Sequence, residues 1–286
     1  MHLPNLPRAF DVDSTQGHQT LIAFIALHTV AGLVLLPILC ATFAFARVKR
    51  HPILPVMSSC LVPASFLGTL LFYADHSLYD TPLAMGRLLH SPVCLTQAAL
   101  LHHPVPPMMA VAIAVLLLHL WNTVRDATTS VEAEKPKPWK LTSLLLAPFV
   151  AFVVFALAST LMMANDFAND RAVIELRLYC KFEHNGIAIV RAVFTGLVLV
   201  VTACCAGRIS MRLFHLSPGM KNAAERAALC RVAVLFVYVV LGIVFSVISV
   251  FTVSPITDMY LATIPMVIFL LFASSKDIRE AWSFWK

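Results

Sequence analysis

The chain has 286 residues, of which 59% are hydrophobic and only 13% are charged. Because a soluble protein is usually about 25% charged, this composition argues against a soluble enzyme, a disordered scaffold and a free nucleic-acid-binding protein. The net charge of +6 and the mean hydropathy of +0.83 fit an integral membrane protein instead. In such a protein lysine and arginine collect on the cytoplasmic side, so the basic balance implies no nucleic acid.

Residues 1–20 form a polar segment that lacks the basic and apolar regions of a signal peptide. We therefore expect this extracellular segment to stay attached and the first hydrophobic stretch to remain in the membrane. A membrane-spanning helix needs about 20 mostly apolar residues. The longest apolar region divides into two spans at Ser254 and Pro255, which favour a turn. The predicted spans are residues 21–46, 52–74, 91–121, 141–164, 185–207, 230–252 and 258–275.

These spans predict an all-α membrane protein, a seven-transmembrane helix bundle over residues 21–275. Pro104, Pro106 and Pro107 interrupt the third span and leave two arrangements open. Either one kinked helix covers residues 91–121, or a loop ends near Pro107 and a span of 14 residues follows. A helix of that length rises only about 21 Å, short of the roughly 30 Å hydrocarbon core. The kinked helix is therefore preferred.

Basic residues are distributed unevenly between the two sides of the predicted bundle. With the N-terminus outside, 15 of the 21 lysine and arginine residues lie on the inner side. This asymmetry predicts an extracellular N-terminus and a cytoplasmic C-terminus. In the cytoplasmic tail, residues 276–286, one helical face carries Ile278, Ala281, Trp282 and Trp285. We expect a short amphipathic helix in the inner interface, the alternative being a frayed tail whose tryptophans touch lipid.

Two cysteines are expected on the extracellular side. Cys94 lies at the outer start of the third span, and Cys180 lies in the loop after the fourth span. Because disulfides persist outside the cell, a bridge between them would fasten this loop over the mouth of the bundle. Two unpaired thiols are the alternative.

Ionisable residues inside the predicted spans are few, and they are the first candidates for a functional site. Arg191 lies about 9 Å into the fifth span. It either extends to the lipid headgroups or faces the bundle and meets an anionic group. His102 and His103 lie at the proline break, where a structural role is favoured over ligand contact. The chain has no HExxH motif, no recognisable catalytic triad and no phosphate-binding loop, so it predicts no enzyme, metal site or cofactor.

Other seven-helix classes fit the sequence less well. A retinal-binding photoreceptor needs a lysine in its last span, and residues 259–275 contain none. A three-plus-one-plus-three sugar transporter should show a parallel repeat, but Pro37 and Pro63 have no counterparts in spans five and six. The middles of the spans carry no acidic residue, which argues against proton-coupled transport. A transporter or channel and a non-signalling membrane scaffold remain the alternatives.

Several short motifs are similar to those of G-protein-coupled receptors, most nearly the fungal and cAMP-receptor-like branches. Residues 94–98, CLTQA, resemble the C-x-x-Q-[AG] opening of the third helix, and residues 118–125, LHLWNTVR, resemble its basic inner end. Cys180 in the second outer loop, Pro265 in the seventh span, and Ser275 before the short tail also fit. The chain departs from the family in lacking the D-R-Y and N-P-x-x-Y motifs.

The resemblance implies an extracellular ligand, a heterotrimeric G protein on the cytoplasmic side and a location in the plasma membrane, surrounded by membrane lipid. Gln97, Arg191 and Tyr260 would meet near the outer mouth and offer the ligand an amide, a fixed cation and a hydroxyl. Arg191 predicts a ligand with an acidic or strongly hydrogen-bonding group. On the inner side, Arg125 and Glu225 are the predicted switch, because they are the obvious pair of opposite charges between spans three and six.

Overall fold

The computed structural model describes residues 15–45, 53–74, 91–128, 138–169, 174–176, 178–182, 184–216, 223–251, 255–274, 278 and 282. These residues form long helices and one short hairpin. In chain order the elements are α1 (Thr15–Leu27), the π-helix η1 (His28–Leu35), α2 (Leu36–Phe45), α3 (Ile53–Ala74), α5 (Pro92–Leu100), α6 (Val105–Thr128), α7 (Pro138–Ala168), β1 (Ile174–Leu176), β2 (Cys180–Phe182), α8 (Asn185–Leu216), α9 (Ala223–Phe251) and α10 (Pro255–Ala273).

The predicted seven-helix, all-α membrane bundle is confirmed, and the chain is a multi-pass integral membrane protein. Several helices begin at a proline, among them Pro92, Pro138 and Pro255. A first helical position needs no N–H, so Pro138 and Pro255 can start their helices three residues before the predicted spans begin. The orientation of the bundle stays a prediction. Within the described residues the spans are Gly17–Phe43, Pro55–Ala74, Pro92–His119, Leu141–Ala168, Gly186–Met211, Cys230–Ile248 and Pro255–Ala273.

The first and second spans pack closely where η1 faces α3. The ring of His28 would lie 3.2–3.3 Å from a Cβ on Gly68, and the Oγ of Ser65 would lie only 2.0 Å from a Cβ on Gly32. The two glycines therefore let the helices approach each other closely. His28 of η1 packs against Gly68 of α3, and Ser65 of α3 packs against Gly32 of η1. The wide turn of a π-helix, often found at functional sites, begins at His28.

The third span is a single span of 28 residues, Pro92–His119, broken at residues 101–104. Pro104, Pro106 and Pro107 have no N–H and cannot continue the hydrogen-bond ladder of α5. The chain therefore leaves the helix at a turn and starts again as α6, whose first turn tolerates prolines. The region is one span, as in the kinked arrangement, but the helix is interrupted at the turn and does not run through it. It does not fit the alternative of a loop followed by a 14-residue span, because α6 alone has 24 residues.

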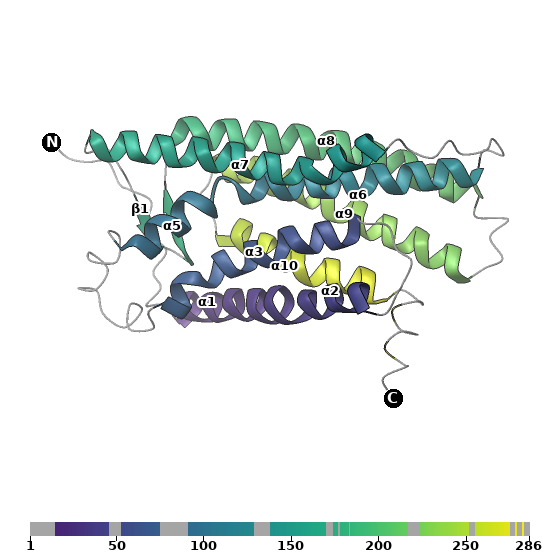
Figure 1. Ribbon diagram of the computed structural model, residues 1–286, viewed down its shortest axis with the longest axis horizontal. Helices are drawn as coiled ribbons and strands as arrows, with labels where there is room; N and C mark the ends of the chain where they lie inside the picture. The colour runs from purple at the N-terminus through teal and green to yellow at the C-terminus, as the bar shows by residue number, and fades with distance from the viewer. Residues whose placement is uncertain are drawn as a thin grey trace.

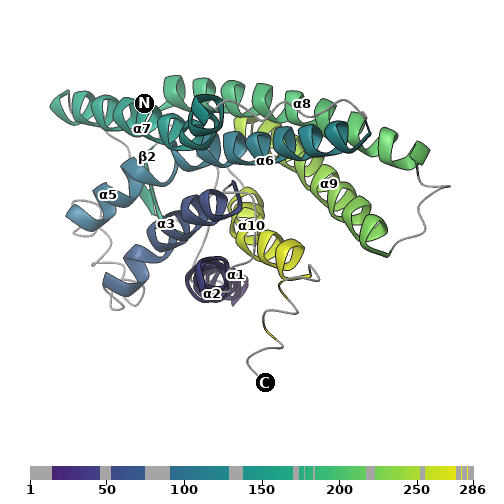
Figure 2. The same cartoon turned by 45° about the vertical axis from the view of Figure 1, so that its right-hand side comes forward.

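The longer half of the third span, α6, lies at the centre of the molecule. In Figures 1 and 2, α7 and α8 run along one side of α6, while α1, α2, α3 and α10 lie on the other side. The most apolar stretch of the third span is 72% buried, against 17% for the fourth span. The core is thus built around α6, and α7 lies at the periphery.

The loop between the fourth and fifth spans folds into an antiparallel hairpin. Ile174 pairs with Phe182, and Leu176 pairs with Cys180. Figure 1 shows this hairpin beside α5 at one end of the bundle. All of residues 178–182 are buried, so the second strand is packed into the end of the bundle.

Both ends of the chain fall largely outside the described residues, including residues 1–14 and most of the tail. Ile278 is fully buried. The indole N–H of Trp282 donates to the Oγ1 of Thr42 at 2.9 Å, and its ring stacks on Phe269. The contacts of Trp282 hold this residue of the predicted apolar face against the first and seventh spans. The amphipathic helix itself stays a prediction.

Candidate functional site

A cavity of about 230 Å³ lies inside the bundle. Among the described residues, its walls come from the hairpin and from every span except the fourth. Most of the wall is apolar, with polar side chains at a few points, as is typical of small-molecule sites. The apolar residues include Phe24, Leu101, Met109, Ile113, Leu199 and Ile264.

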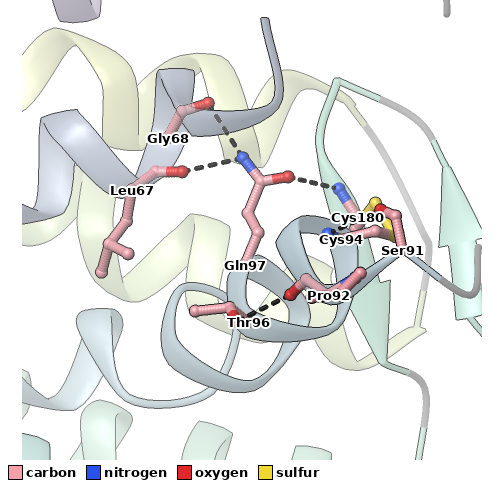
Figure 3. Close-up of a disulfide and its surroundings, with 8 residues drawn as sticks. All are labelled: Leu67, Gly68, Ser91, Pro92, Cys94, Thr96, Gln97 and Cys180. Atoms are coloured by element: carbon pink, nitrogen blue, oxygen red, sulfur yellow. Dashed lines mark hydrogen bonds between the residues drawn. A yellow bond between two sulfur atoms is a disulfide. The ribbon is translucent and has the colours of Figure 1, made fainter. Parts of the chain in front are cut away.

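A disulfide holds the hairpin at this cavity. Cys94 and Cys180 are bonded, as predicted, with their Cα atoms 5.4 Å apart (Figure 3). Both cysteines are fully buried. The cavity is lined by three residues close to Cys180 in the sequence, namely Tyr179, Lys181 and Phe182. The bridge therefore fixes a cover that itself carries cavity-lining side chains.

Gln97 does not line the cavity, contrary to its predicted place in the ligand site. It is fully buried, and its side-chain amide donates to the carbonyl oxygens of Leu67 at 2.7 Å and Gly68 at 3.4 Å. Its Oε1 accepts the N–H of Cys180 at 3.0 Å (Figure 3). Because the amide joins α3, α5 and β2, the geometry assigns Gln97 a structural role beside the disulfide.

A buried ion pair joins the hairpin to the seventh span. The Nζ of Lys181 lies 2.5 Å from the Oδ2 of Asp258, and the two side chains are 4% and 6% exposed. The hydroxyl of Tyr179 donates to the other carboxylate oxygen at 3.0 Å. All three residues line the cavity. Sequence analysis missed this pair, although Asp258 is the single charged residue in the long apolar stretch 232–275.

Arg191 faces the interior of the bundle and does not extend to the headgroups. It is 8% exposed and lines the cavity from α8. Its Nη1 donates to the carbonyl of His102 at 3.0 Å and lies 3.1 and 3.4 Å from the two ring nitrogens. A donor in the plane of the ring cannot be this close to both nitrogens, so the guanidinium lies over the ring face.

The ring of His102 connects the guanidinium to the ion pair. Its Nδ1 lies 3.3 Å from the hydroxyl of Tyr179, which in turn bonds to Asp258. A polar chain thus runs from Arg191 on α8, through the break in the third span and the hairpin, to α10. Because four separate segments of the sequence meet here, no local sequence motif predicts these contacts.

Tyr260 lines the cavity, but its hydroxyl is engaged elsewhere. The hydroxyl donates to the carbonyl of Tyr238 at 2.7 Å. A Cβ on Gly242 would lie 2.8 Å from this oxygen, so the glycine makes room for it. The ring packs against Tyr238 and Phe245, with centroids 5.0 and 4.8 Å away. Tyr260 therefore offers the cavity an aromatic ring where a hydroxyl was predicted.

Several cavity-lining side chains hold buried polar atoms that have no partner among the described residues. His103 illustrates the chemistry: its Nε2 bonds the carbonyl of Phe182 at 3.0 Å, which leaves the Nδ1 as an acceptor. Buried polar groups in proteins are nearly always hydrogen-bonded. Their concentration in its wall makes the cavity the candidate site for a hydrogen-bonding ligand. The atoms are His28 Nδ1, Ser65 Oγ, His103 Nδ1, His184 Nδ1, Thr195 Oγ1 and Thr257 Oγ1.

The predicted switch lies beyond this description. Arg125 is in α6 and Glu225 is in α9, but both side chains fall outside the described part of the chain. In the residues that are described, no group of three or more His, Cys, Asp or Glu side chains is placed to hold a metal ion.

Comparison with known proteins adds no relative. The sequence matches no protein-family model, and it matches no curated protein significantly. Fold and cavity together define a seven-span integral membrane protein with an internal polar site beneath a disulfide-tethered hairpin.

Proposed function

We propose that this protein is a receptor of the G-protein-coupled type in the plasma membrane. It binds a small extracellular ligand in the cavity and signals to a heterotrimeric G protein on the cytoplasmic side. The observation that carries the proposal is the position of the cavity. It is covered by a hairpin bonded to the third span, and its described lining residues come from six of the seven spans. The sequence resemblance to this superfamily supports it.

The polar chain offers a route from ligand binding to a change in helix arrangement. Arg191, His102, Tyr179 and Asp258 belong to four segments that are linked by hydrogen bonds across the cavity. A ligand that competes for these groups binds one arrangement of the segments better than another. Differential affinity of this kind shifts the population of helix arrangements, which is what signalling across the membrane requires.

The charges are placed for binding from one side. Asp258 is the fourth residue of α10, and Lys181 belongs to the hairpin at the same end of the bundle. A transporter is expected to hold its charged groups near the middle of the membrane instead. This difference favours a receptor over the transporter or channel alternative.

Nucleotide exchange tests the proposal. Purified protein in lipid nanodiscs is mixed with Gα–Gβγ heterotrimers of the major classes, and the rate of GTP-analogue uptake is followed without added ligand and with a mixture of small organic acids. We expect acceleration of at least one class over empty nanodiscs, and loss of that acceleration after reduction of the disulfide.

Two results would contradict the proposal. Exchange at the rate of empty nanodiscs for every heterotrimer, together with accumulation of a labelled acid by proteoliposomes, would make the protein a transporter. If neither nucleotide exchange nor accumulation is observed, the alternative of a non-signalling membrane scaffold would stand.

A further inference from the structure

We propose that the cavity takes a small phenol, whose hydroxyl is bound by Ser65 and His28 and whose ring lies against Phe24. This inference rests on the cavity being the ligand site of the proposed function. It deepens that function by naming a chemical class for the ligand and the two residues that hold its polar group.

The polar contact point lies where the first span packs against the second. Ser65 of α3 is fully buried, and His28, the first residue of η1, is 7% exposed. Both residues line the cavity. The Oγ of Ser65 and the Nδ1 of His28 have no hydrogen-bond partner among the described residues. Because buried polar atoms are nearly always hydrogen-bonded, these two atoms are the candidates for contact with a ligand.

The packing of the two helices brings these side chains together. Gly32 lies about one turn after His28, and Gly68 lies about one turn after Ser65. His28 packs against Gly68, while Ser65 packs against Gly32. The two side chains therefore lie about one helical turn apart across a single helix contact. Close packing holds both of them in place, which reduces the entropic cost of binding a ligand there.

A hydroxyl is the group that suits this pair. The Oγ of Ser65 can donate or accept, and the Nδ1 of His28 does either one according to the tautomer of its ring. A hydroxyl has one donor and two acceptor sites, so it can bond both side chains whichever tautomer is present. Neither side chain carries a fixed charge, and burial of a charge without a counter-charge is costly. The group bound at this point is therefore neutral.

Aromatic and apolar side chains lie beside the polar pair. The ring of Phe24 packs edge-on against His28, with centroids 4.6 Å apart, and it stacks on Tyr179 at 6.0 Å. Phe24 and Ala64 line the cavity next to the two polar residues. An aromatic ring in the ligand extends this row of rings, and ring pairs gain free energy beyond the burial of their apolar area.

The volume of the cavity sets the size of the ligand. A cavity of roughly 150 Å³ accepts benzene, and this one has about 230 Å³, which leaves room for two small substituents on the ring. p-Cresol has this size. p-Xylene replaces the hydroxyl of p-cresol with a methyl group of similar volume, and trans-4-methylcyclohexanol keeps the hydroxyl but lacks the aromatic ring. All three probes are uncharged, so the comparison does not depend on the charged residues of the cavity.

Binding is measured without a G protein, as thermal stabilisation of the purified full-length protein in nanodiscs. The dependence of the stabilisation on probe concentration gives the affinity. The quantity compared is the affinity ratio of p-cresol to p-xylene in the wild type and in each variant, because partition of the probes into lipid then cancels. In the wild type, trans-4-methylcyclohexanol should bind about two- to tenfold more weakly than p-cresol.

Two variants test the polar contact separately. Ser65→Ala removes one of the two partners of the hydroxyl, so the affinity ratio should fall about two- to tenfold. His28→Phe keeps an aromatic ring against Gly68 but removes the Nδ1, and it should lower the same ratio by a similar factor. Both substitutions remove polar atoms that have no partner among the described residues, so the variants should fold.

Ser159→Ala is the matched control. Ser159 is also fully buried and without a partner among the described residues, but it lies on α7 outside the cavity lining. This substitution should leave the affinity ratio unchanged. Thr195→Val tests the competing position for the hydroxyl, because Thr195 lines the cavity from α8, on the other side of α6 (Figures 1 and 2).

Failure of p-cresol to stabilise the wild type would overturn the inference. An affinity ratio that stays unchanged in Ser65→Ala or in His28→Phe would also overturn it, since the hydroxyl would then bind elsewhere. A larger fall in Thr195→Val than in Ser65→Ala would place the hydroxyl at α8 instead. Equal binding of p-cresol and trans-4-methylcyclohexanol would contradict the aromatic class.

The inference and the proposed function can fail independently. A protein that binds p-cresol in this way but accelerates nucleotide exchange on no heterotrimer would retain the inference and lose the proposed function. A protein that accelerates exchange but does not bind p-cresol would retain the proposed function and lose the inference.

Discussion

The third and fourth spans are both 28 residues long, mostly apolar and contain proline, yet they have opposite roles. The third is buried over 72% of its most apolar stretch, and the fourth over 17%. The third provides Cys94, Gln97 and His102, each of which bonds to another segment. The fourth provides no described residue to the cavity, and its outward face is a strip of apolar side chains: Val150, Val153, Val154, Leu157 and Leu161.

This difference between the third and fourth spans indicates which interactions stabilise the bundle. Lipid tails are as apolar as these side chains, so apolar burial does not drive helices together in a bilayer. Close packing and polar links between segments must do so, and the described links concentrate on the third span and the hairpin. Substitutions there should be costly, and equivalent substitutions on the fourth span should not.

The largest effect is expected from the disulfide. Cys94→Ser or Cys180→Ser opens a bridge between residues 86 apart in sequence, which on the chain-entropy relation removes about 4.5 kcal/mol of stability. Thermal unfolding of purified protein and surface expression in cells measure the loss. Cys230→Ser is the control, because that thiol is exposed on α9, and it should change neither quantity. Recovery of Cys94 and Cys180 as free thiols from native protein would contradict the assignment.

The next effect concerns the ion pair that attaches the hairpin to the seventh span. Lys181→Met leaves the Asp258 carboxylate buried without its cation, which should cost about 3 kcal/mol. Asp258→Leu should cost a similar amount for the converse reason. The double substitution replaces the pair with apolar groups and should recover most of the loss in a thermal unfolding assay. Equal losses in the double and single variants would show that the pair does not stabilise the bundle.

A matched pair of polar residues tests the comparison of the two spans itself. Gln97→Leu removes the partner of the Cys180 N–H and the Leu67 carbonyl, and it should destabilise the protein by about 2 kcal/mol. Ser159→Ala on the fourth span removes a fully buried hydroxyl that has no partner in the described residues, and it should be neutral or slightly stabilising. Similar thermal unfolding of the two variants would remove the distinction drawn between the spans.

Much of the fold could be predicted because apolar length is a local property. Each span is a continuous stretch of sequence, so hydropathy located all seven, and the prolines at residues 104, 106 and 107 marked the break in the third. Helix starts were less accurate, because Pro255 begins α10 in a position where its missing N–H has no cost. Cys94 and Cys180 were paired by reasoning about the side of the membrane, which needs no knowledge of packing.

The site was harder to predict, because its contacts join distant segments. The sequence places Arg191 within the fifth span, but only the packing of α8 decides that it faces inward and does not extend to the headgroups. Gln97 was misplaced, since its partners lie 30 residues away on α3 and 83 residues away on β2. Asp258 was overlooked because it lies near a helix end, where its pairing with Lys181 depends on how the hairpin folds back.

The smallest effect is expected at the end of the bundle opposite the hairpin, where the predicted switch joins the third span to the sixth. On the proposed function, Glu225→Ala should raise signalling without ligand, because the predicted switch would lose the carboxylate that pairs with Arg125. An exposed ion pair contributes only about 0–1 kcal/mol. While the active fraction is small, a contribution near the upper end of that range raises it about two- to fivefold. Basal nucleotide exchange on the G protein is the measurement.

A double-mutant cycle separates a real contact from two independent loop charges. Arg125→Ala should raise basal exchange as Glu225→Ala does, or abolish coupling if Arg125 itself contacts the G protein. Arg226→Ala is the control at the neighbouring residue, because Arg226 is expected to compete for Asp126. Loss of Arg226 should leave the predicted Arg125–Glu225 contact intact. If the double variant differs from the sum of the Arg125→Ala and Glu225→Ala effects, the two residues are in contact at the inner ends of the spans. Strict additivity would mean that they do not, and the inactive arrangement would then depend on packing alone.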